Sequence, residues 1–302
     1  MPWFHFAILS AIFFAGSNIL DKFILEKRIK NYLAYFIAGG SIWFVFALIL
    51  FSFLFLSPIS TSLPIILLSI ASGILAGTTW LLWYKALSKE EVSRTIAVYY
   101  LYPIFVALLA RIFLREEISF LKWLAIVLAV CGAILISLKR EKLSQKIVLR
   151  TVFPIILLAS FIEGAMETID KYVLFQISPW HLIVLGSFGL FIMTSLIFIC
   201  SLNSRRETIR IFLNFSILKP VLLVNFLYFL ATLLFFFAAS LASITYVSAV
   251  SVSQPLFVFL LTIILSWRFP QILQEPIDRR TILIKIFSII LVVGGILIII
   301  LT

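Results

Sequence analysis

The chain has 302 residues, of which 63% are hydrophobic and only 12% are charged, and its formal net charge at pH 7 is +11. A water-soluble domain needs more charged residues than this to cover its surface, so the composition excludes a soluble fold and indicates an integral membrane protein. The positive charge could suggest nucleic acid. The basic residues flank apolar runs, however, so the positive-inside rule explains them better and we expect no nucleic-acid partner.

Apolar runs of about 20 residues, the length that crosses the hydrocarbon core of a bilayer, recur along the chain. The first run has no basic residue before it and no small-residue cleavage site, so we interpret it as a retained span and not as a signal peptide. We therefore predict an all-α polytopic membrane protein with ten transmembrane helices, at residues 6–22, 32–56, 64–86, 94–114, 119–138, 153–174, 181–201, 220–241, 244–266 and 281–301.

The two halves of the chain resemble each other. The run "LSAIFFAGSNILDKFIL" (Leu9 to Leu25) aligns with "LASFIEGAMETIDKYVL" (Leu158 to Leu174), and each contains an Asp-Lys pair at the same place. A duplication of five helices explains this match, with halves at 1–143 and 150–302. Because five is an odd number, the second half enters the membrane from the opposite side. We therefore predict two inverted five-helix repeats.

The distribution of basic residues predicts the topology. Of the 24 Lys and Arg residues, 20 lie in or beside the loops that follow the first, third, fifth, seventh and ninth predicted helices. The positive-inside rule places these odd-numbered loops in the cytoplasm. We therefore expect a multi-pass protein of the cell membrane with both chain termini outside.

Two acidic residues, Glu163 and Glu167, are the only acids well inside a predicted span. On a helix they lie on one face with Asp170, and Glu163 falls near the bilayer midplane. A carboxylate there is costly and should face the interior of the bundle, where it could carry a proton or balance the charge of a cationic solute. The alternative is a structural contact between helices, for example with Lys85 or Arg111.

Two prolines, Pro103 and Pro255, interrupt the fourth and ninth predicted helices at equivalent positions of the two halves. Proline removes a backbone hydrogen bond and bends a helix. Discontinuous helices at matching places in two repeats indicate a binding site, so the adjacent Tyr102 and Gln254 are candidate solute contacts. A simple kink with its backbone groups satisfied by polar side chains is the alternative.

Three other spans carry candidate contacts. Asn225 and Tyr228 form a polar stripe with Thr232 on the eighth predicted helix, Trp80 lies on the third, and Asn18 of the first aligns with one of the glutamates. Aromatic faces opposite a polar face suit a solute with an apolar or cationic part. For the tryptophans, an interfacial aromatic belt is the alternative.

No motif of a hydrolase, a nucleotide-binding loop or a metal site occurs in the sequence. The two cysteines, Cys131 and Cys200, fall within separate predicted spans and indicate neither a disulfide nor a metal site. We therefore expect no enzymatic activity, no cofactor and no metal. The expected partners are a small-molecule solute and membrane lipids, with protons as a hypothesis, and the sequence leaves monomer and homodimer equally open.

The run from Trp83 to Arg140 resembles the end of an EamA-type repeat of the drug/metabolite transporter superfamily. The resemblance rests on Ala-Leu-Ser at 86–88, Tyr-Pro-Ile-Phe at 102–105, Phe-Leu-x-Glu at 113–116 and the glycine at 132. It implies a ten-helix secondary carrier that works by alternating access through a central cavity lined by both repeats. The second half is a looser match, because Ser-Trp-Arg-Phe at 266–269 replaces the Phe-Leu-x-Glu element.

The related small multidrug resistance proteins are similar in having a membrane-embedded Glu eight residues before a Lys. Glu163 and Lys171 reproduce this spacing, whereas Phe14 occupies the matching position of the first repeat. The function predicted is a secondary transporter of a small organic solute, a metabolite or a drug, with proton coupling as a hypothesis. The alternatives are a flippase for a lipid-linked or amphiphilic substrate and a non-transporting membrane scaffold.

Overall fold

The computed structural model describes residues 1–54, 61–87, 98–137, 146–268 and 279–301. Several features predicted from the sequence lie outside these ranges: the end of the second span, the start of the fourth, the last residue of the fifth, positions 88 and 269, and most of the basic loops at 88–97, 138–145 and 269–278.

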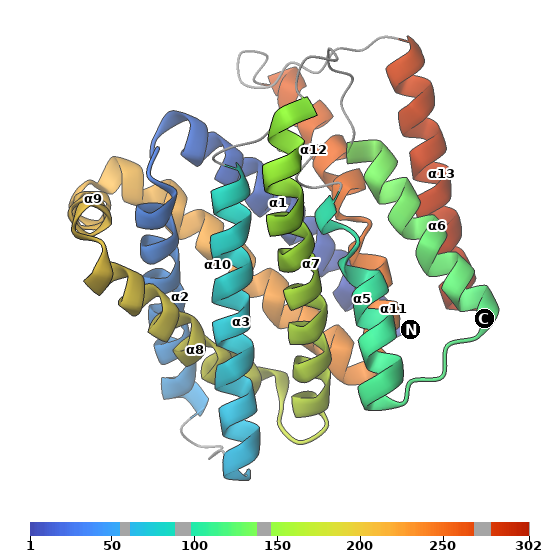
Figure 1. The fold of residues 1–302 in the computed structure, drawn as a ribbon, viewed down its shortest axis with the longest axis horizontal. Coiled ribbons are helices and arrows are strands. Elements are labelled where there is room, and N and C mark those ends of the chain that lie inside the picture. Colours follow the sequence, from blue (N-terminus) through green and yellow to red (C-terminus); the bar gives the residue numbers. More distant parts are fainter. Residues whose placement is uncertain (55–60, 88–97, 138–145, 269–278, 302) are drawn as a thin grey trace.

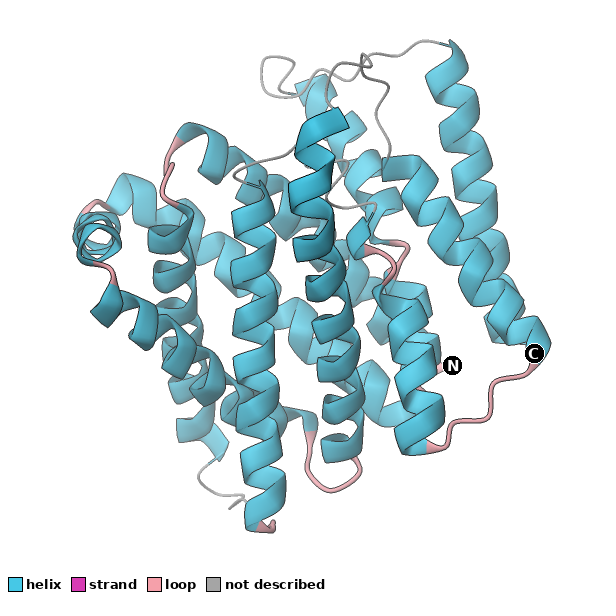
Figure 2. Cartoon of the chain, viewed as in Figure 1, coloured by secondary structure: helices cyan, strands magenta, loops and turns pink. Residues whose placement is uncertain are grey.

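The described residues form a helical bundle without a β-strand among them (Figure 2). The helices, labelled in Figure 1, are α1 (Pro2–Lys27), α2 (Tyr32–Leu54), α3 (Leu63–Leu87), α5 (Tyr102–Leu109), the π-helix η1 (Ala110–Leu114), α6 (Phe120–Ser137), α7 (Lys146–Leu174), α8 (Pro179–Cys200), α9 (Leu202–Leu213), α10 (Phe215–Leu241), α11 (Ile244–Ser251), α12 (Gln254–Arg268) and α13 (Arg279–Leu301).

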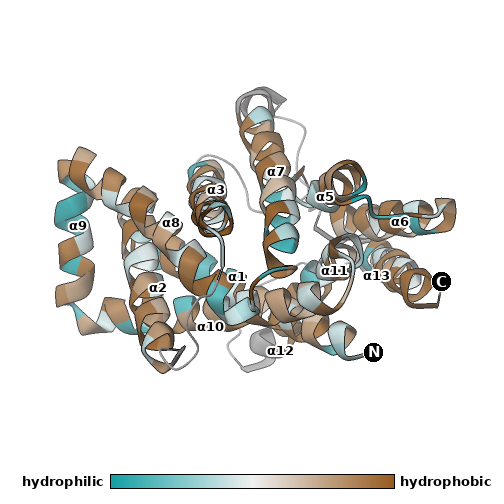
Figure 3. Ribbon diagram, turned by 90° about the horizontal axis from the view of Figure 1, so that it is seen from below, coloured by the Kyte–Doolittle hydropathy of each residue, from teal (hydrophilic) through white to brown (hydrophobic). Residues whose placement is uncertain are grey.

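Within the described ranges, eight segments are long and apolar enough to cross a membrane, and two shorter apolar helices, Tyr102–Leu114 and Phe120–Leu135, accompany them. Many large apolar side chains lie exposed on the outside of the bundle, and Figure 3 shows the outer faces of the helices as mainly hydrophobic. Lipid, and not water, is the solvent that suits such a surface. The protein is therefore an all-α polytopic membrane protein, as the composition predicts.

A short helix, α9, replaces the loop that the sequence predicts between the seventh and eighth spans. Figure 1 shows α9 nearly end-on, across the direction of the long helices. It is amphipathic: Arg205, Arg206 and Arg210 are exposed, while Thr208 is buried and donates a hydrogen bond to the Ala34 carbonyl of α2 (3.4 Å). Such a helix suits the membrane interface.

The helices of the two halves pack in matched pairs. Helix α1 of the first half packs on α10 of the second. Helix α7, the counterpart of α1 in the predicted repeats, packs in the same way on α3, the counterpart of α10. Likewise α5 contacts α7, while α11 and α12 contact α1. Two further pairs, α6 with α13 and α2 with α8, join counterparts directly. The pair α3 with α8 departs from the pattern, because its counterpart pair, α10 with α2, is much less extensive. Exchanging the two halves therefore preserves most of the packing pattern but not all of it.

Small residues allow two of these pairs to approach closely. A Cβ atom added to Gly73 of α3 would lie 1.7 Å from the Gly186 carbonyl oxygen of α8, and one added to Gly295 of α13 would lie 2.6 Å from the Ala125 carbonyl oxygen of α6. Backbones so close leave no room for larger side chains. These contacts form two tightly packed seams of the bundle.

Both halves contain a broken helix at the same place. A turn at 100–101 precedes α5, and a turn at 252–253 separates α11 from α12. Pro103 and Pro255 each occupy the second position of the helix that follows, where a missing backbone N–H leaves no hydrogen bond unmade. The prediction of a bend within a continuous helix was thus too mild, because the chain makes a turn and starts a new helix.

Candidate functional site

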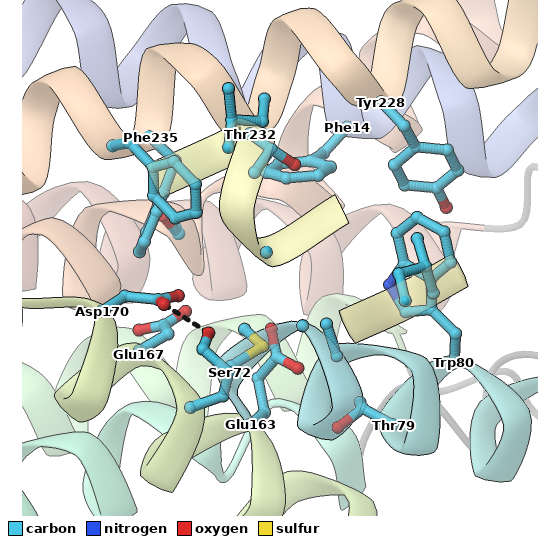
Figure 4. A pocket seen from close by; sticks show the side chains of 18 of the residues that line it. Phe14, Ser72, Thr79, Trp80, Glu163, Glu167, Asp170, Tyr228, Thr232 and Phe235 are labelled. Carbon is cyan, nitrogen blue, oxygen red and sulfur yellow. Dashed lines mark hydrogen bonds between the residues drawn. The ribbon is translucent and has the colours of Figure 1, made fainter. Parts of the chain in front are cut away.

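A cavity of about 170 Å³ lies between the two halves. Helices α1, α2, α3 and α5 of the first half contribute to its wall, and so do α7, α8, α10, α11 and α12 of the second. Its lining is partly polar in a bundle whose exterior is mainly apolar (Figure 4). Polar groups that converge on one concave site identify it as the candidate binding site.

One wall of the cavity is acidic and belongs to α7. Glu163, Glu167 and Asp170 all line the cavity, as their helical spacing predicts. Glu167, which is 4% exposed, accepts a hydrogen bond from the Ser248 hydroxyl group of α11. Asp170, which is 1% exposed, accepts one from the Ser72 hydroxyl group of α3, marked by the dashed line in Figure 4. Both buried carboxyl groups therefore have a partner on another helix.

Glu163 differs from the other two acids because it is only half-buried. Its carboxyl group lies near the hydroxyl groups of Tyr99 and Thr79. Gly164, the next residue, packs against Phe105 of α5, where an added Cβ atom would lie 2.8 Å from the Phe105 Cβ. The glycine thus holds α7 against α5, and the acid beside it is the one most accessible from the cavity.

The opposite wall is aromatic. Figure 4 shows Phe14 of α1 and Tyr228 and Phe235 of α10 across the cavity from the three acids, with Trp80 of α3 at one side. The rings support one another, since the Tyr228 ring centroid lies 5.6 Å from that of Trp80 and 5.7 Å from that of Phe14. Trp43 of α2 lies 5.3 Å from Trp80. Contacts of this kind hold the π faces in place around the cavity.

The structure brings most of the predicted contact residues together. Seven of the eight candidates line the cavity, namely Asn18, Trp80, Tyr102, Glu163, Glu167, Tyr228 and Gln254. Asn225 does not. Its amide group donates a hydrogen bond to the Val221 carbonyl (2.8 Å), and a Cβ atom added to Gly39 of α2 would lie 3.2 Å from the Asn225 Oδ1 atom. Asn225 therefore serves helix packing, and its prediction as a cavity residue is corrected.

Ser72, Thr79 and Ser187 also line the cavity and were missed as candidates. Thr232 and Ser251 line it too, and the sequence does place them beside the candidates Tyr228 and Gln254. Serine and threonine recur in every span, so the sequence offers no signal that separates the three missed residues. Asp170 did have a signal, since it shares the helical face of the two glutamates.

A second buried acid, Asp21, lies behind the cavity wall. It accepts hydrogen bonds from the hydroxyl groups of Tyr35 and Tyr228, the latter at 2.8 Å. The Tyr228 hydroxyl group is also 2.7 Å from Asn18 Oδ1. Asp21 is the counterpart of Asp170 in the predicted repeats. Each acid accepts a hydrogen bond from a helix of the other half: Asp21 of α1 from Tyr228 of α10, and Asp170 of α7 from Ser72 of α3. Asp21 thus orients the aromatic wall.

Two charged side chains hold the corner between α10 and α11. Glu116 accepts hydrogen bonds from the backbone N–H group of Ile244 (3.0 Å) and from the Thr245 hydroxyl group (2.6 Å), at the beginning of α11. Lys171 donates to the carbonyl oxygens of Ala239 (2.7 Å) and Ala242 (2.8 Å), at the end of α10. An anion at a helix N-terminus and a cation at a C-terminus both complement the helix dipole.

Replacing Glu116 with alanine should lower the free energy of unfolding by about 1–2 kcal/mol, because the N-terminal N–H groups of α11 lose their acceptor and the helix dipole loses its charge partner. Thermal unfolding of the purified protein in detergent measures this change. Glu117→Ala is the matched control, since Glu117 is adjacent and exposed. Equal stability of the two variants would contradict a capping role for Glu116.

Comparison with known proteins shows likenesses over part of the chain. Residues 1–138 match the EamA-like transporter family. Protein RarD of Salmonella typhi is 36% identical over 63 residues, which are 21% of this chain and 21% of that protein. Protein RarD of Escherichia coli (strain K12) is 33% identical over 76 residues, 25% of each chain. The chain thus matches only about a fifth to a quarter of the length of these curated relatives.

A solved crystal structure of another protein superimposes with a TM-score of 0.71 over 98% of this chain and 96% of that chain. The sequences are 12% identical, so the likeness is one of fold alone. The fold match extends over the second half, which the family match does not reach. Residues 1–138, somewhat less than half of the chain, therefore resemble the EamA-like transporter family, and the likeness of fold covers the rest.

Proposed function

We propose that the protein is a secondary transporter that moves a small organic solute across the cell membrane by alternating access. The observation that carries this proposal is the cavity between the two halves, where three carboxyl groups and several aromatic rings converge inside an apolar bundle. Acidic groups within membrane spans are costly and mark ion or solute pathways. The match to a family of transporters supports the same activity.

The proposal includes two inverted repeats of five membrane-crossing helices, at 1–143 and 150–302. The matched helix pairs support it, because exchanging the halves returns most of the same helix pairs. The two broken helices support it as well, since their turns at 100–101 and 252–253 are at equivalent positions. Repeats of this kind rock against each other around a central site, which opens to one side at a time.

The broken helices are the proposed hinges. A turn between two short helices can change its backbone angles without disrupting the hydrogen bonds of either helix. Tyr102 and Gln254 begin the helices that follow the turns, and both line the cavity. A solute that touches these residues would therefore contact the segments that move. The odd-numbered loops are cytoplasmic and the termini outside in this proposal, on the strength of the basic residues alone.

The small size of the cavity favours a small solute over an amphiphile. About 170 Å³ leaves little room for a lipid-linked sugar, so no observation favours the flippase. Among the described residues no group of His, Cys, Asp and Glu is arranged to hold a metal ion. We therefore propose neither an enzymatic role nor a cofactor.

Alternating access predicts that one cavity residue reacts with a membrane-impermeant thiol reagent applied from either side. Ala76 of α3 lines the cavity and its side chain is small, so Ala76→Cys is a suitable probe. Cys131 and Cys200 are free and exposed and should first be replaced by serine. We expect labelling in intact cells and in inside-out vesicles, because the cavity opens to each side in turn.

The control is Ala159→Cys, in the same cysteine-free background. Ala159 of α7 is fully buried and does not line the cavity, so it should react from neither side. Labelling of Ala76→Cys from one side only would contradict alternating access and favour the scaffold alternative.

A further inference from the structure

We propose that the solute is a compact organic cation, whose ammonium group lies at the acidic wall of α7 and whose apolar part lies against the aromatic wall formed by α1, α3 and α10. This inference rests on the proposed transport function and adds the chemical class of the solute. Its first support is the charge of the site. Three carboxyl groups line the cavity, and over the described parts of the chain no Lys, Arg or His joins them.

The nearest basic residue along α7 does not neutralise the acids. Lys171 follows Asp170 directly, but its ammonium group donates to the carbonyl oxygens at the end of α10 and lies over the Phe175 ring, 4.8 Å from its centroid. A buried carboxylate without a counter-charge costs several kcal/mol, so the acids ionise only when a cation accompanies them. Either a proton or a cationic solute can serve, and the two compete for the same groups.

A buried hydroxyl group beside Glu163 adds a second oxygen atom to the site. Thr79 of α3 is fully buried, lines the cavity and lies close to the Glu163 carboxyl group, but its Oγ1 atom makes no hydrogen bond of good geometry. Buried polar groups are almost always paired, because an unmade hydrogen bond is costly. An ammonium group offers only donors. It can therefore bond the Glu163 carboxylate and the Thr79 oxygen together.

The aromatic wall supplies the rest of the site. Tyr228 and Phe14 face the acids across the cavity and Trp80 lies at one side (Figure 4). A ring face attracts a cation through its quadrupole and also packs against apolar groups. An anion would meet three carboxyl groups and several negative ring faces. With a neutral solute, protons alone would have to neutralise the acids, and the solute would gain nothing from their charge. Of the three charge classes, a cation therefore complements both walls best.

The volume limits the size of the cation. A cavity of about 150 Å³ in another protein holds one molecule of benzene. The volume here, about 170 Å³, is similar, so the site takes a molecule of about one ring with a short polar group. Benzylammonium meets both requirements. Benzyl alcohol and benzoate have the same ring with a neutral and an anionic group, and they are therefore matched probes for the effect of charge.

The test is the thermal unfolding of the purified protein in detergent with each of the three compounds. A ligand that binds only the folded state raises the melting temperature. We expect benzylammonium to raise it by about 2–4 °C at a few times its Kd, and the other two to leave it unchanged. An equal or larger rise with benzyl alcohol or benzoate, or no rise with any of the three, would overturn the proposal.

Three variants locate the site. Glu163→Gln should abolish the rise because it removes the negative charge that attracts the ammonium group, and Thr79→Val should reduce it because it removes an oxygen acceptor. Thr168→Val is the control: Thr168 of α7 bonds the Gly164 carbonyl (2.8 Å) and does not line the cavity, so the rise should persist. Full binding by Glu163→Gln and Thr79→Val together would overturn the assignment of these groups.

The labelling rate of Ala76→Cys also reports whether a ligand occupies the cavity, and this test leaves the acids unchanged. Benzylammonium should slow the labelling, and benzoate should not. An unchanged rate with benzylammonium would overturn the proposal even if an acid variant failed to fold. Labelling from both sides without cation binding would support the transport proposal and overturn the proposal of a cationic solute. Cation binding with labelling from one side only would overturn the transport proposal and support the cation site.

Discussion

Replacing Glu163 with glutamine should remove the pH dependence of solute uptake and leave the protein folded. Glutamine has nearly the shape of glutamate but neither carries the charge nor exchanges the proton. Glu163 is the acid most accessible from the cavity, whereas Glu167 and Asp170 are buried and hold hydroxyl partners on other helices. The carboxyl group that a proton and a cationic solute reach most readily is therefore that of Glu163.

The loss of one charge-assisted hydrogen bond should weaken cation binding by about 10–100-fold. The other titratable groups that face Glu163 are Glu167 and Asp170 on its own helix, Tyr99 before α5 and Tyr102 at the start of α5, and all four remain in the variant. Uptake of benzylammonium into proteoliposomes over a pH series measures the effect. Glu117→Gln, at an exposed position, should keep the wild-type pH profile. The same profile in Glu163→Gln would refute the coupling role.

Replacing Gly73 with alanine should severely destabilise the fold, and leucine there should prevent it. The added Cβ atom would lie 1.7 Å from the Gly186 carbonyl oxygen, so α3 and α8 would have to separate. Overpacking of a tight contact costs about 3 kcal/mol when backbone must move. The separation would also displace the acceptors and donors of the cavity, because Ser72 and Thr79 lie on the same helix.

The yield of folded protein and its thermal unfolding in detergent measure this effect. Gly294→Ala is the matched control, because no heavy atom lies within 4 Å of the added Cβ atom. It should keep the wild-type melting temperature. A stable Gly73→Ala variant would show that the contact between α3 and α8 adapts, which the structure does not lead us to expect.

Sequence reasoning predicted the acidic wall of the cavity because its signal was strong. Charged residues inside a span are so costly that their position and helical spacing alone indicate an interior face, and Glu163, Glu167 and Asp170 do line one cavity. The error at Asn225 has the opposite cause. Helix α10 has apolar residues on all sides and few polar ones, so its sequence determines its rotation about its own axis only loosely. Whether one amide faces a cavity or a neighbouring helix depends on packing.

Two features of the fold were missed for different reasons. The segment 202–213 has basic residues at its exposed positions, and its charge suggested a loop although its apolar residues have a helical period. The breaks before α5 and α12 coincide with prolines that the sequence did identify. Proline indicates that a helix is disturbed, but the size of the disturbance depends on the residues before it. The turns at 100–101 and 252–253 could not be read from composition.

The corner between α10 and α11 differs in kind from the seams where glycine and alanine bring backbones together. Glu116, Lys171 and Lys122, which donates to the Tyr246 hydroxyl group (2.9 Å), join this corner to the rest of the bundle through polar contacts. Water can replace such partners at little net cost, whereas a glycine seam that opens leaves a void. We therefore expect the helix pairs with glycine contacts to move as rigid units. The corner between α10 and α11 should separate more readily, and more so when water can enter it.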